Sequence, residues 1–185
     1  GVFSQTSEKS TNLGHTLIPA GRHFHMSGEK VSANAVERTH AFLTHDWGED
    51  QLNHVLVSKI NAHLKRRGII TWFDDERMTG EIRDKMAEGI ENTQCAVVFI
   101  TPRYRDKVNG NGSANDNCRY EFKYAGRVLG VDKLIPVVVD ESMKDPGTWN
   151  GILGAELGGK LYIDMTDHDD ASLTAKSIEL YNNIV

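Results

Sequence analysis

Hydrophobic residues gather along the chain in five short runs, and these runs predict five β-strands. The runs lie at residues 39–44, 69–73, 95–100, 134–139 and 160–163. The third and fourth are almost wholly apolar, which is typical of parallel strands buried on both faces. The chain is therefore expected to build a parallel sheet covered on both sides.

Between these runs, apolar residues return every three or four positions, which is the spacing of one face of a helix. This pattern predicts helices over about residues 52–67, 82–90, 117–129 and 172–184. The stripe of the first helix consists of Leu52, Val55, Leu56, Ile60, His63 and Leu64. His63 is interpreted as a half-buried packing residue rather than a catalyst. Strands alternating with helices predict an α/β fold with a doubly wound, five-stranded parallel sheet and helices on both faces.

Several segments lack these periods. Residues 1–37 are polar and aperiodic, which predicts a flexible N-terminal arm or linker before one domain at 38–185. Residues 105–117 are rich in Asn and Gly and are expected to form a surface loop. The stretch between the fourth and fifth strands is expected to be irregular, with one turn of helix after Pro146 and Trp149 as its anchor.

Pro136 lacks an amide hydrogen, so its strand is expected near an edge or with a bulge.

Composition narrows the class of protein. At 185 residues and 39% hydrophobic content, the chain can bury one sizeable core. A net charge of -5 argues against nucleic acid or an anionic membrane surface as the main partner. No apolar run approaches the roughly 20 residues that span a bilayer. Two cysteines and no signal-peptide core favour a cytoplasmic protein.

The carboxyl ends of the strands define the candidate site, because open parallel sheets bind ligands there. The residues that follow the first four strands are His45, Asp46 and Trp47; Asp74, Asp75 and Glu76; Thr101 to Tyr104; and Asp140. Five of these eleven residues are acidic. Trp47 fits two interpretations equally, a stacking surface for a ligand ring and plain core packing.

Glu121 joins this set from the helix after the third strand. It follows Cys118 by three residues and precedes Ala125 by four, so it lies at the edge of the apolar helix face. Most helical glutamates are solvated, because charged side chains avoid burial unless they are paired or used. A carboxylate that points toward the core near the mouth of the sheet is a candidate for site chemistry.

Two chemistries fit an acidic rim. In a phosphoacceptor receiver, clustered aspartates hold Mg²⁺ and one is phosphorylated; here Thr101 stands where an acceptor aspartate is expected. In a sugar-binding or glycoside-cleaving site, a carboxylate stabilises an oxocarbenium-like transition state. The common nucleotide, zinc and nucleophile-elbow motifs do not occur. His23 and His25 have no Cys or carboxylate at ligand spacing, so no metal site is predicted.

Four motifs in order resemble a Toll/interleukin-1 receptor (TIR) domain. They are Phe42-Leu43-Thr44-His45-Asp46, then Phe73-Asp74-Asp75 with Gly80 and Ile82, then Thr101-Pro102-x-Tyr104, and last Cys118-x-x-Glu121. The resemblance covers about residues 39–164. It implies a flavodoxin-like fold, which agrees with the sheet predicted from periodicity.

The resemblance also implies roles for particular residues. The loop from Asp74 to Ile82 would correspond to the BB loop, which mediates TIR–TIR contacts and gates the ligand cleft. Its candidate interaction residues are Asp75, Met78, Thr79, Gly80 and Ile82. Glu121 matches the glutamate that catalytic members require to hydrolyse NAD⁺. The candidate NAD⁺-binding residues are His45, Asp46, Trp47, Asp74 and Cys118.

These residues lead to one hypothesis and one alternative. The hypothesis is an NAD⁺ nucleosidase (NAD⁺ glycohydrolase) that cleaves the nicotinamide–ribose bond to give nicotinamide and ADP-ribose or a cyclic isomer. It would serve innate-immune or cell-death signalling, depend on self-association into a homo-oligomer, and use NAD⁺ as substrate with no cofactor. The alternative is a non-catalytic adaptor that signals through TIR–TIR contacts. Glu121 favours the enzyme, because pure adaptors generally do not keep this glutamate.

Overall fold

The computed structural model describes residues 39–73, 82–113 and 116–185. The predicted arm at 1–37 lies outside these residues, and so do Asp74, Asp75, Met78, Thr79 and Gly80 of the predicted interaction loop. Within the described ranges, no helix is long and apolar enough to cross a membrane.

Five parallel strands form one sheet, as the apolar runs predict. They are β1 (Thr39–Thr44), β2 (Thr71–Trp72), β3 (Thr93–Ile100), β4 (Leu134–Val138) and β5 (Ile163–Asp164). Their order in the sheet is β2-β1-β3-β4-β5, and every neighbouring pair is parallel. The order reverses between β1 and β3, so the carboxyl ends of these strands flank the switch point where such folds bind ligands.

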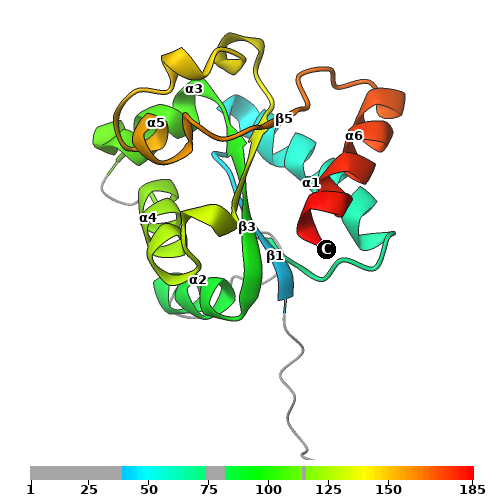
Figure 1. Cartoon of the computed structure of the whole chain (residues 1–185), viewed down its shortest axis with the longest axis horizontal. Helices are drawn as coiled ribbons and strands as arrows, with labels where there is room; N and C mark the ends of the chain where they lie inside the picture. Colours follow the sequence, from blue (N-terminus) through cyan, green and yellow to red (C-terminus); the bar gives the residue numbers. More distant parts are fainter. Residues whose placement is uncertain (1–38, 74–81, 114–115) are drawn as a thin grey trace, which may run out of the picture. The chain divides into compact units, whose positions relative to one another are not determined.

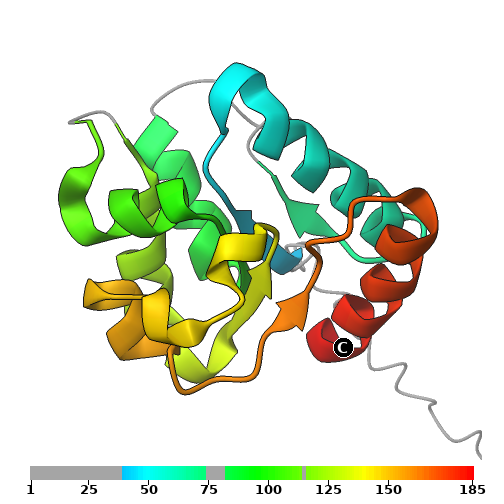
Figure 2. The ribbon, with the colours of Figure 1, turned by 90° about the horizontal axis from the view of Figure 1, so that it is seen from above.

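Helices cover both faces of the sheet, which confirms the doubly wound, flavodoxin-like α/β prediction (Figures 1 and 2). The α-helices are α1 (Leu52–Lys65), α2 (Ile82–Glu91), α3 (Pro102–Asp106), α4 (Cys118–Val128), α5 (Gly151–Leu157) and α6 (Asp170–Ile184). Shorter turns are η1 (Glu49–Gln51), η3 (Lys107–Asn111), η4 (Val131–Lys133), η5 (Glu141–Met143) and η6 (Pro146–Thr148). Helices α1 and α6 pack on one face, and α2, α4 and α5 lie on the other.

The two faces carry separate hydrophobic clusters. Val97 and Phe99 of β3 belong to the cluster under α1 and α6, whereas Val98 and Ile100 belong to the cluster under α2, α4 and α5. This alternation explains why the third apolar run is unbroken, because successive side chains of a strand point to opposite faces.

The predicted stripe of α1 is wrong at its first two positions. The side chains of Leu52 and Val55 are 68% and 52% exposed, whereas His54 is buried. Each helical residue turns the chain by about 100°, so Val55 lies opposite the buried pair Val57 and Leu64. His63 is half-buried, as expected.

Three further segments differ from expectation. The predicted surface loop at 105–117 contains the end of α3 and the π-helical η3, because Thr101 caps the Tyr104 amide and Pro102 occupies the first helical turn. The stretch between the fourth and fifth strands has the expected turn of helix at Pro146 and buries Trp149, but it also contains the helix α5. The fifth strand begins at Ile163 rather than at residue 160, and Leu161 is 96% exposed.

Pro136 lies in β4, next to the edge strand β5. The Val139 amide donates to Ile100 of β3, whereas the Val138 carbonyl accepts from Met165 on the β5 side. The backbone polar groups of successive strand residues point to opposite sides, so the nitrogen of Pro136, like the polar groups of Val138, faces β5. Strand β5 pairs only with Val137 and Val138, so the missing Pro136 amide breaks no ladder bond. The expectation of a place near the edge is confirmed.

Candidate functional site

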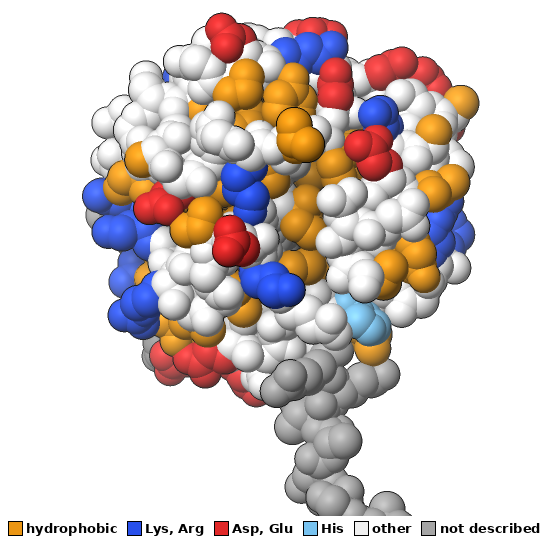
Figure 3. Space-filling model, viewed as in Figure 1, with side chains coloured by type: hydrophobic (Ala, Val, Ile, Leu, Met, Phe, Trp, Pro, Cys, Tyr) orange, Lys and Arg blue, Asp and Glu red, His pale blue; other side chains and the backbone are white. Residues whose placement is uncertain are grey.

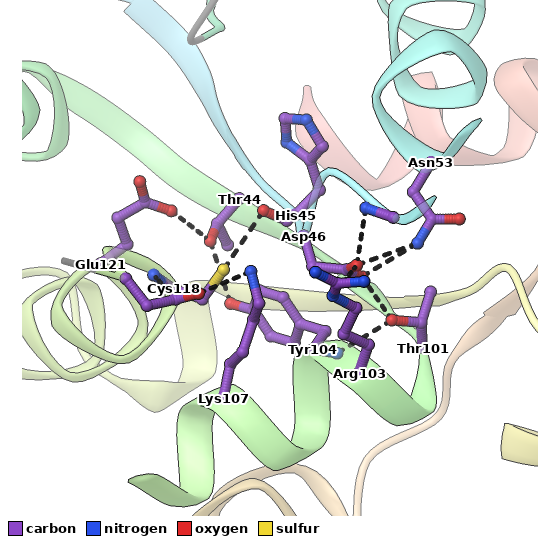
Figure 4. A network of polar contacts seen from close by, with 12 residues as sticks. Thr44, His45, Asp46, Asn53, Thr101, Arg103, Tyr104, Lys107, Cys118 and Glu121 are labelled. Atoms are coloured by element: carbon purple, nitrogen blue, oxygen red, sulfur yellow. Dashed lines mark hydrogen bonds and ion pairs between the residues drawn. The ribbon is translucent and has the colours of Figure 1, made fainter. Parts of the chain in front are cut away.

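The carboxyl ends of β1 and β3 meet the first turn of α4, and polar side chains from all three segments form one connected network (Figure 4). Thr44 ends β1, Thr101 follows β3, and Glu121 lies one turn into α4. These positions are where the switch-point rule predicts a ligand site.

Glu121 is a buried carboxylate at one end of this network. Its side chain is 4% exposed. The Thr44 hydroxyl donates to Glu121 Oε2 across 2.6 Å, and the Tyr104 hydroxyl lies 3.0 Å from Thr44 Oγ1. Because the single hydroxyl hydrogen of Thr44 points at the carboxylate, the Tyr104 hydroxyl donates to Thr44.

Tyr104 supports this chain of hydrogen bonds from inside the core. Its side chain is fully buried, and that burial raises the pKa of its phenol well above the usual range, even though the Thr44 hydrogen bond lowers it. The phenol therefore keeps its hydrogen at neutral pH. The chain Tyr104–Thr44–Glu121 holds the carboxylate as a fixed hydrogen-bond acceptor.

Asp46 organises the turn after β1. Its carboxylate accepts from the Gly48 amide at 2.9 Å and from Asn53 Nδ2 at 3.0 and 3.1 Å. The Thr101 hydroxyl also donates to Asp46 Oδ2, and Arg103 Nε lies 3.8 Å from Oδ1. The Asp46 side chain is therefore occupied by the protein itself and fixes the rim of the site.

Thr101 joins the Asp46 cluster to the Glu121 cluster. Its hydroxyl donates to Asp46 and accepts from the Tyr104 amide at 2.9 Å, which positions the residue that supports Thr44. A phosphoacceptor receiver would need an aspartate at the end of β3. Thr101 stands there instead, so the site offers no phosphoacceptor at this position.

Histidines and aromatic rings stack on the other side of the β1 end. His45 Nε2 lies 2.9 Å from His54 Nδ1, and His54 lies between Trp47 and Phe73, with ring centroids at 4.6 and 4.9 Å. Burial, reinforced by the neighbouring His54, lowers the pKa of His45 to about 3. His45 is therefore neutral at physiological pH. Trp47 is 37% exposed, so its ring packs on His54 and also reaches solvent.

Cys118 lies beside the carboxylate without acting as a nucleophile. Its thiol donates to the His45 carbonyl oxygen at 3.4 Å, and its side chain is buried. Burial, followed by the nearby Glu121 carboxylate, raises the pKa of this thiol far above its ordinary value. A protonated thiol is a weak nucleophile.

The structure thus brings together four of the predicted residues, His45, Asp46, Cys118 and Glu121, with Trp47 attached through the ring stack. Ile82 lies at the start of α2 and is 43% exposed. In the described part of the chain, no three His, Cys, Asp or Glu side chains are placed to hold a metal ion.

Sequence reasoning missed two residues that shape the rim, His54 and Asn53. His54 precedes the buried Val57 and Asn61 by three and seven residues, and this spacing is the signal that would have placed it on the inward face of α1. Asn53 carries no periodic signal, because it is held by Asp46 rather than by packing.

The sheet order and the buried carboxylate at its switch point define a doubly wound α/β protein with a preformed polar site. A sequence profile of the TIR domain matches residues 42–177. The chain belongs to the TIR domain family.

Comparison with solved structures supports the same fold. Similar chains include the TIR domains in the structure of the activated Roq1 resistosome directly recognizing the pathogen effector XopQ. This match has a TM-score of 0.55 and 14% sequence identity, and covers 78% of the present chain and 98% of the other. No curated protein sequence matches significantly.

Proposed function

We propose that this TIR domain is an NAD⁺ nucleosidase that cleaves the bond between nicotinamide and ribose. The observation that carries the proposal is the buried Glu121 carboxylate, held by the Thr44 hydroxyl at 2.6 Å at the switch point of the sheet. Family membership supports it, because catalytic TIR domains use a glutamate at the matching position of the Cys118-x-x-Glu121 motif.

The proposed chemistry needs no nucleophile from the protein. The pyridinium leaves from the anomeric carbon of the ribose, and positive charge develops on the ring. Glu121 accepts hydrogen bonds from ribose hydroxyls and stabilises that charge, and a fixed carboxylate in a site of low dielectric is effective in this role. Water or a nucleophile within the nucleotide then completes the reaction, giving ADP-ribose or a cyclic isomer.

The hydrogen bond from Thr44 limits the directions in which Glu121 can move. A carboxylate that is already oriented loses little entropy when the transition state forms. The protonated Cys118 thiol beside it adds no competing negative charge. In this proposal Trp47, which is partly exposed, offers a ring surface for nicotinamide or adenine.

Self-association is part of the proposal. The similar TIR domains come from an activated resistosome, and the resemblance assigns the loop from Asp74 to Ile82 to TIR–TIR contacts. A homo-oligomer in which one copy's loop completes the neighbour's site would link activity to assembly. We expect this to occur in the cytoplasm, where NAD⁺ is available and buried free cysteines such as Cys95 and Cys118 stay reduced.

The decisive experiment measures nicotinamide release from NAD⁺ at high protein concentration, with and without a crowding agent. Glu121→Gln keeps the shape of the side chain and removes its charge, so release should fall to background. Glu156→Gln removes an exposed glutamate on α5 as the matched control and should leave release unchanged.

Two outcomes would overturn the catalytic proposal. One is no release by the wild type even under crowding; the other is equal release by the Glu121→Gln variant. Either result would favour the non-catalytic adaptor, in which Glu121 serves only as a buried partner of Thr44.

A further inference from the structure

A groove of about 720 Å³ lies on the outer side of α4, and Glu121 is not among its described lining residues. Its described lining residues come from η3, from the residues just after it, and from the outward face of α4. They are Lys107, Gly110, Gly112, Ser113, Asp116, Arg119, Tyr120, Lys123, Tyr124 and Arg127. A volume of this size suits a small-molecule ligand.

Positive charge dominates the described lining of the groove. Among these residues four are cations, Lys107, Arg119, Lys123 and Arg127, and one is an acid, Asp116. Lys107 Nζ lies 2.5 Å from Asp116 Oδ2, and none of the other three cations forms an ion pair with a described carboxylate. In a chain with a net charge of -5, this local excess is unusual. Lys and Arg side chains gather along the margin where Figure 1 shows α4 (Figure 3).

The backbone of η3 makes room for one of these cations. Gly110 has φ +101°, and a Cβ there would lie 2.7 Å from Arg119 Nη1. Residues other than glycine rarely adopt this backbone conformation, so glycine is favoured at this position. The Arg119 guanidinium therefore packs closely against the backbone at Gly110.

Aromatic rings contact a second cation of the groove, Arg127. The Arg127 guanidinium carbon lies 4.9 Å from the centroid of the Tyr124 ring, which stacks on Tyr120 at 5.5 Å. Arg83 lies 6.0 Å from the Tyr120 ring, and Glu91 accepts from the Tyr124 hydroxyl. Because arginines lie over both stacked rings, the tyrosines are better suited to orient cations than to stack on a ligand base.

We propose that this groove binds the phosphate chain of a polyphosphate, whether free or carried by a nucleotide. Planar guanidinium groups hold phosphate oxygens through paired hydrogen bonds, and a row of exposed cations matches a linear polyanion better than a single carboxylate. Glu121, Thr44 and Tyr104 are not among the described residues that line the groove, so a variant that leaves NAD⁺ intact is still expected to bind the phosphate chain.

The groove also shares lining residues with a second hollow, and one of them contacts the first turn of α4. Lys107 and Asp116 line this second hollow of about 630 Å³, which includes Arg103, the neighbour of Asp46. Asp116 Oδ1 accepts from the Cys118 amide at 2.9 Å, three residues before Glu121. An anion that binds Lys107 would weaken its ion pair with Asp116. Because Asp116 also accepts from the Cys118 amide, this change would affect the first turn of α4.

Isothermal titration calorimetry with inorganic triphosphate in 150 mM salt tests the site. The Arg119→Gln/Lys123→Gln double variant should bind at least tenfold more weakly than the wild type. Lys59→Gln/Arg66→Gln removes one lysine and one arginine from exposed positions of α1 and its C-terminal turn, and should bind as the wild type does. Glu121→Gln should also bind normally, which separates this site from NAD⁺ cleavage.

ATP and citrate identify the ligand chemistry. ATP binding that the double variant also loses would support a nucleotide source, and binding of triphosphate alone would support free polyphosphate. No triphosphate binding, equal weakening in the α1 control, or equally tight binding of citrate would overturn the proposal.

Discussion

The hydroxyl of Thr44 donates to the Glu121 carboxylate across 2.6 Å, joining residues that lie 77 positions apart in the sequence. Thr44 is the last residue of β1, and Glu121 lies in the first turn of α4. The bond therefore depends on the packing of α4 beside β1, which only the folded chain provides. It connects the stability of the carboxyl end of β1 to the orientation of the carboxylate.

Thr44→Val tests whether this bond orients Glu121. Valine has nearly the same shape but no hydroxyl, so Glu121 Oε2 loses its donor and Tyr104 loses its acceptor. Nicotinamide release should fall about 10- to 100-fold, and the free energy of unfolding by about 2 kcal/mol. Enzyme kinetics and urea denaturation measure the two effects.

Thr71→Val is the matched control for that variant. The Thr71 hydroxyl donates to Asn61 Oδ1, also across 2.6 Å and also buried, but at β2. It should lose a similar free energy of unfolding and keep its nicotinamide release. If both variants lose release equally, the effect comes from general destabilisation and not from the orientation of Glu121.

Periodicity predicted the fold well where packing alone decides structure. The alternation of Val97 and Val98 between two cores produces an unbroken apolar run, which is why β3 could be found from sequence. Leu52 and Val55 were wrongly predicted to be buried, because their spacing matches that of a buried stripe. Exposed apolar residues at the start of a helix cost little stability. The fifth strand exists, but its predicted start at residue 160 is wrong, because pairing with β4 and not apolar character sets where β5 begins.

His45 gives the domain a pH-dependent stability. Burial lowers its folded-state pKa to about 3, compared with 6.5 when exposed. Below pH 6.5 the unfolded chain therefore binds a proton that the folded chain excludes, and stability falls progressively toward pH 3. Between pH 6.5 and pH 5 the loss should be about 2 kcal/mol. Urea denaturation at several pH values measures it.

His45→Gln separates this contribution from other titrating groups. The variant is less stable overall because it disturbs the ring stack with His54 and Phe73. Its stability should nevertheless fall less steeply than that of the wild type between pH 6.5 and pH 5. Identical slopes would show that His45 does not exclude the proton.

Ile82 tests the role of the α2 start in self-association. Its side chain is 43% exposed, and it is the last residue of the loop that the resemblance assigns to TIR–TIR contacts. Ile82→Glu should weaken self-association about tenfold with little change in thermal stability, because a charge replaces an apolar contact. Val128→Glu alters a side chain with 41% exposure on α4 and is the matched control. Sedimentation velocity that shows unchanged assembly of Ile82→Glu would contradict this role.

The candidate site was only partly accessible from sequence. Glu121 could be selected because its position on the helix face conflicts with its charge, and the structure places it in the core. The bonds around Asp46 could not be derived, since Asn53 and Thr101 reach it from different elements. Their contribution depends on side-chain geometry, which has no period along the chain.

Gly89 permits the close packing of α2 on β2, and its replacement should destabilise the domain. A Cβ at this position would lie 2.5 Å from Trp72 Nε1, and Trp72 is already stacked on Phe42 at 4.4 Å. The indole is buried and stacked, so a shift would disturb its packing, and Gly89→Ala should cost about 1–3 kcal/mol of unfolding free energy. Gly126→Ala is the matched control on α4, where a Cβ would meet its nearest described neighbour, Leu134 Cδ1, at an ordinary 3.8 Å. It should be neutral or stabilise by up to about 1 kcal/mol, because alanine favours the helix. Urea denaturation that ranks the two variants in the opposite order would show that Trp72 can yield and that α2 is not fixed by this contact.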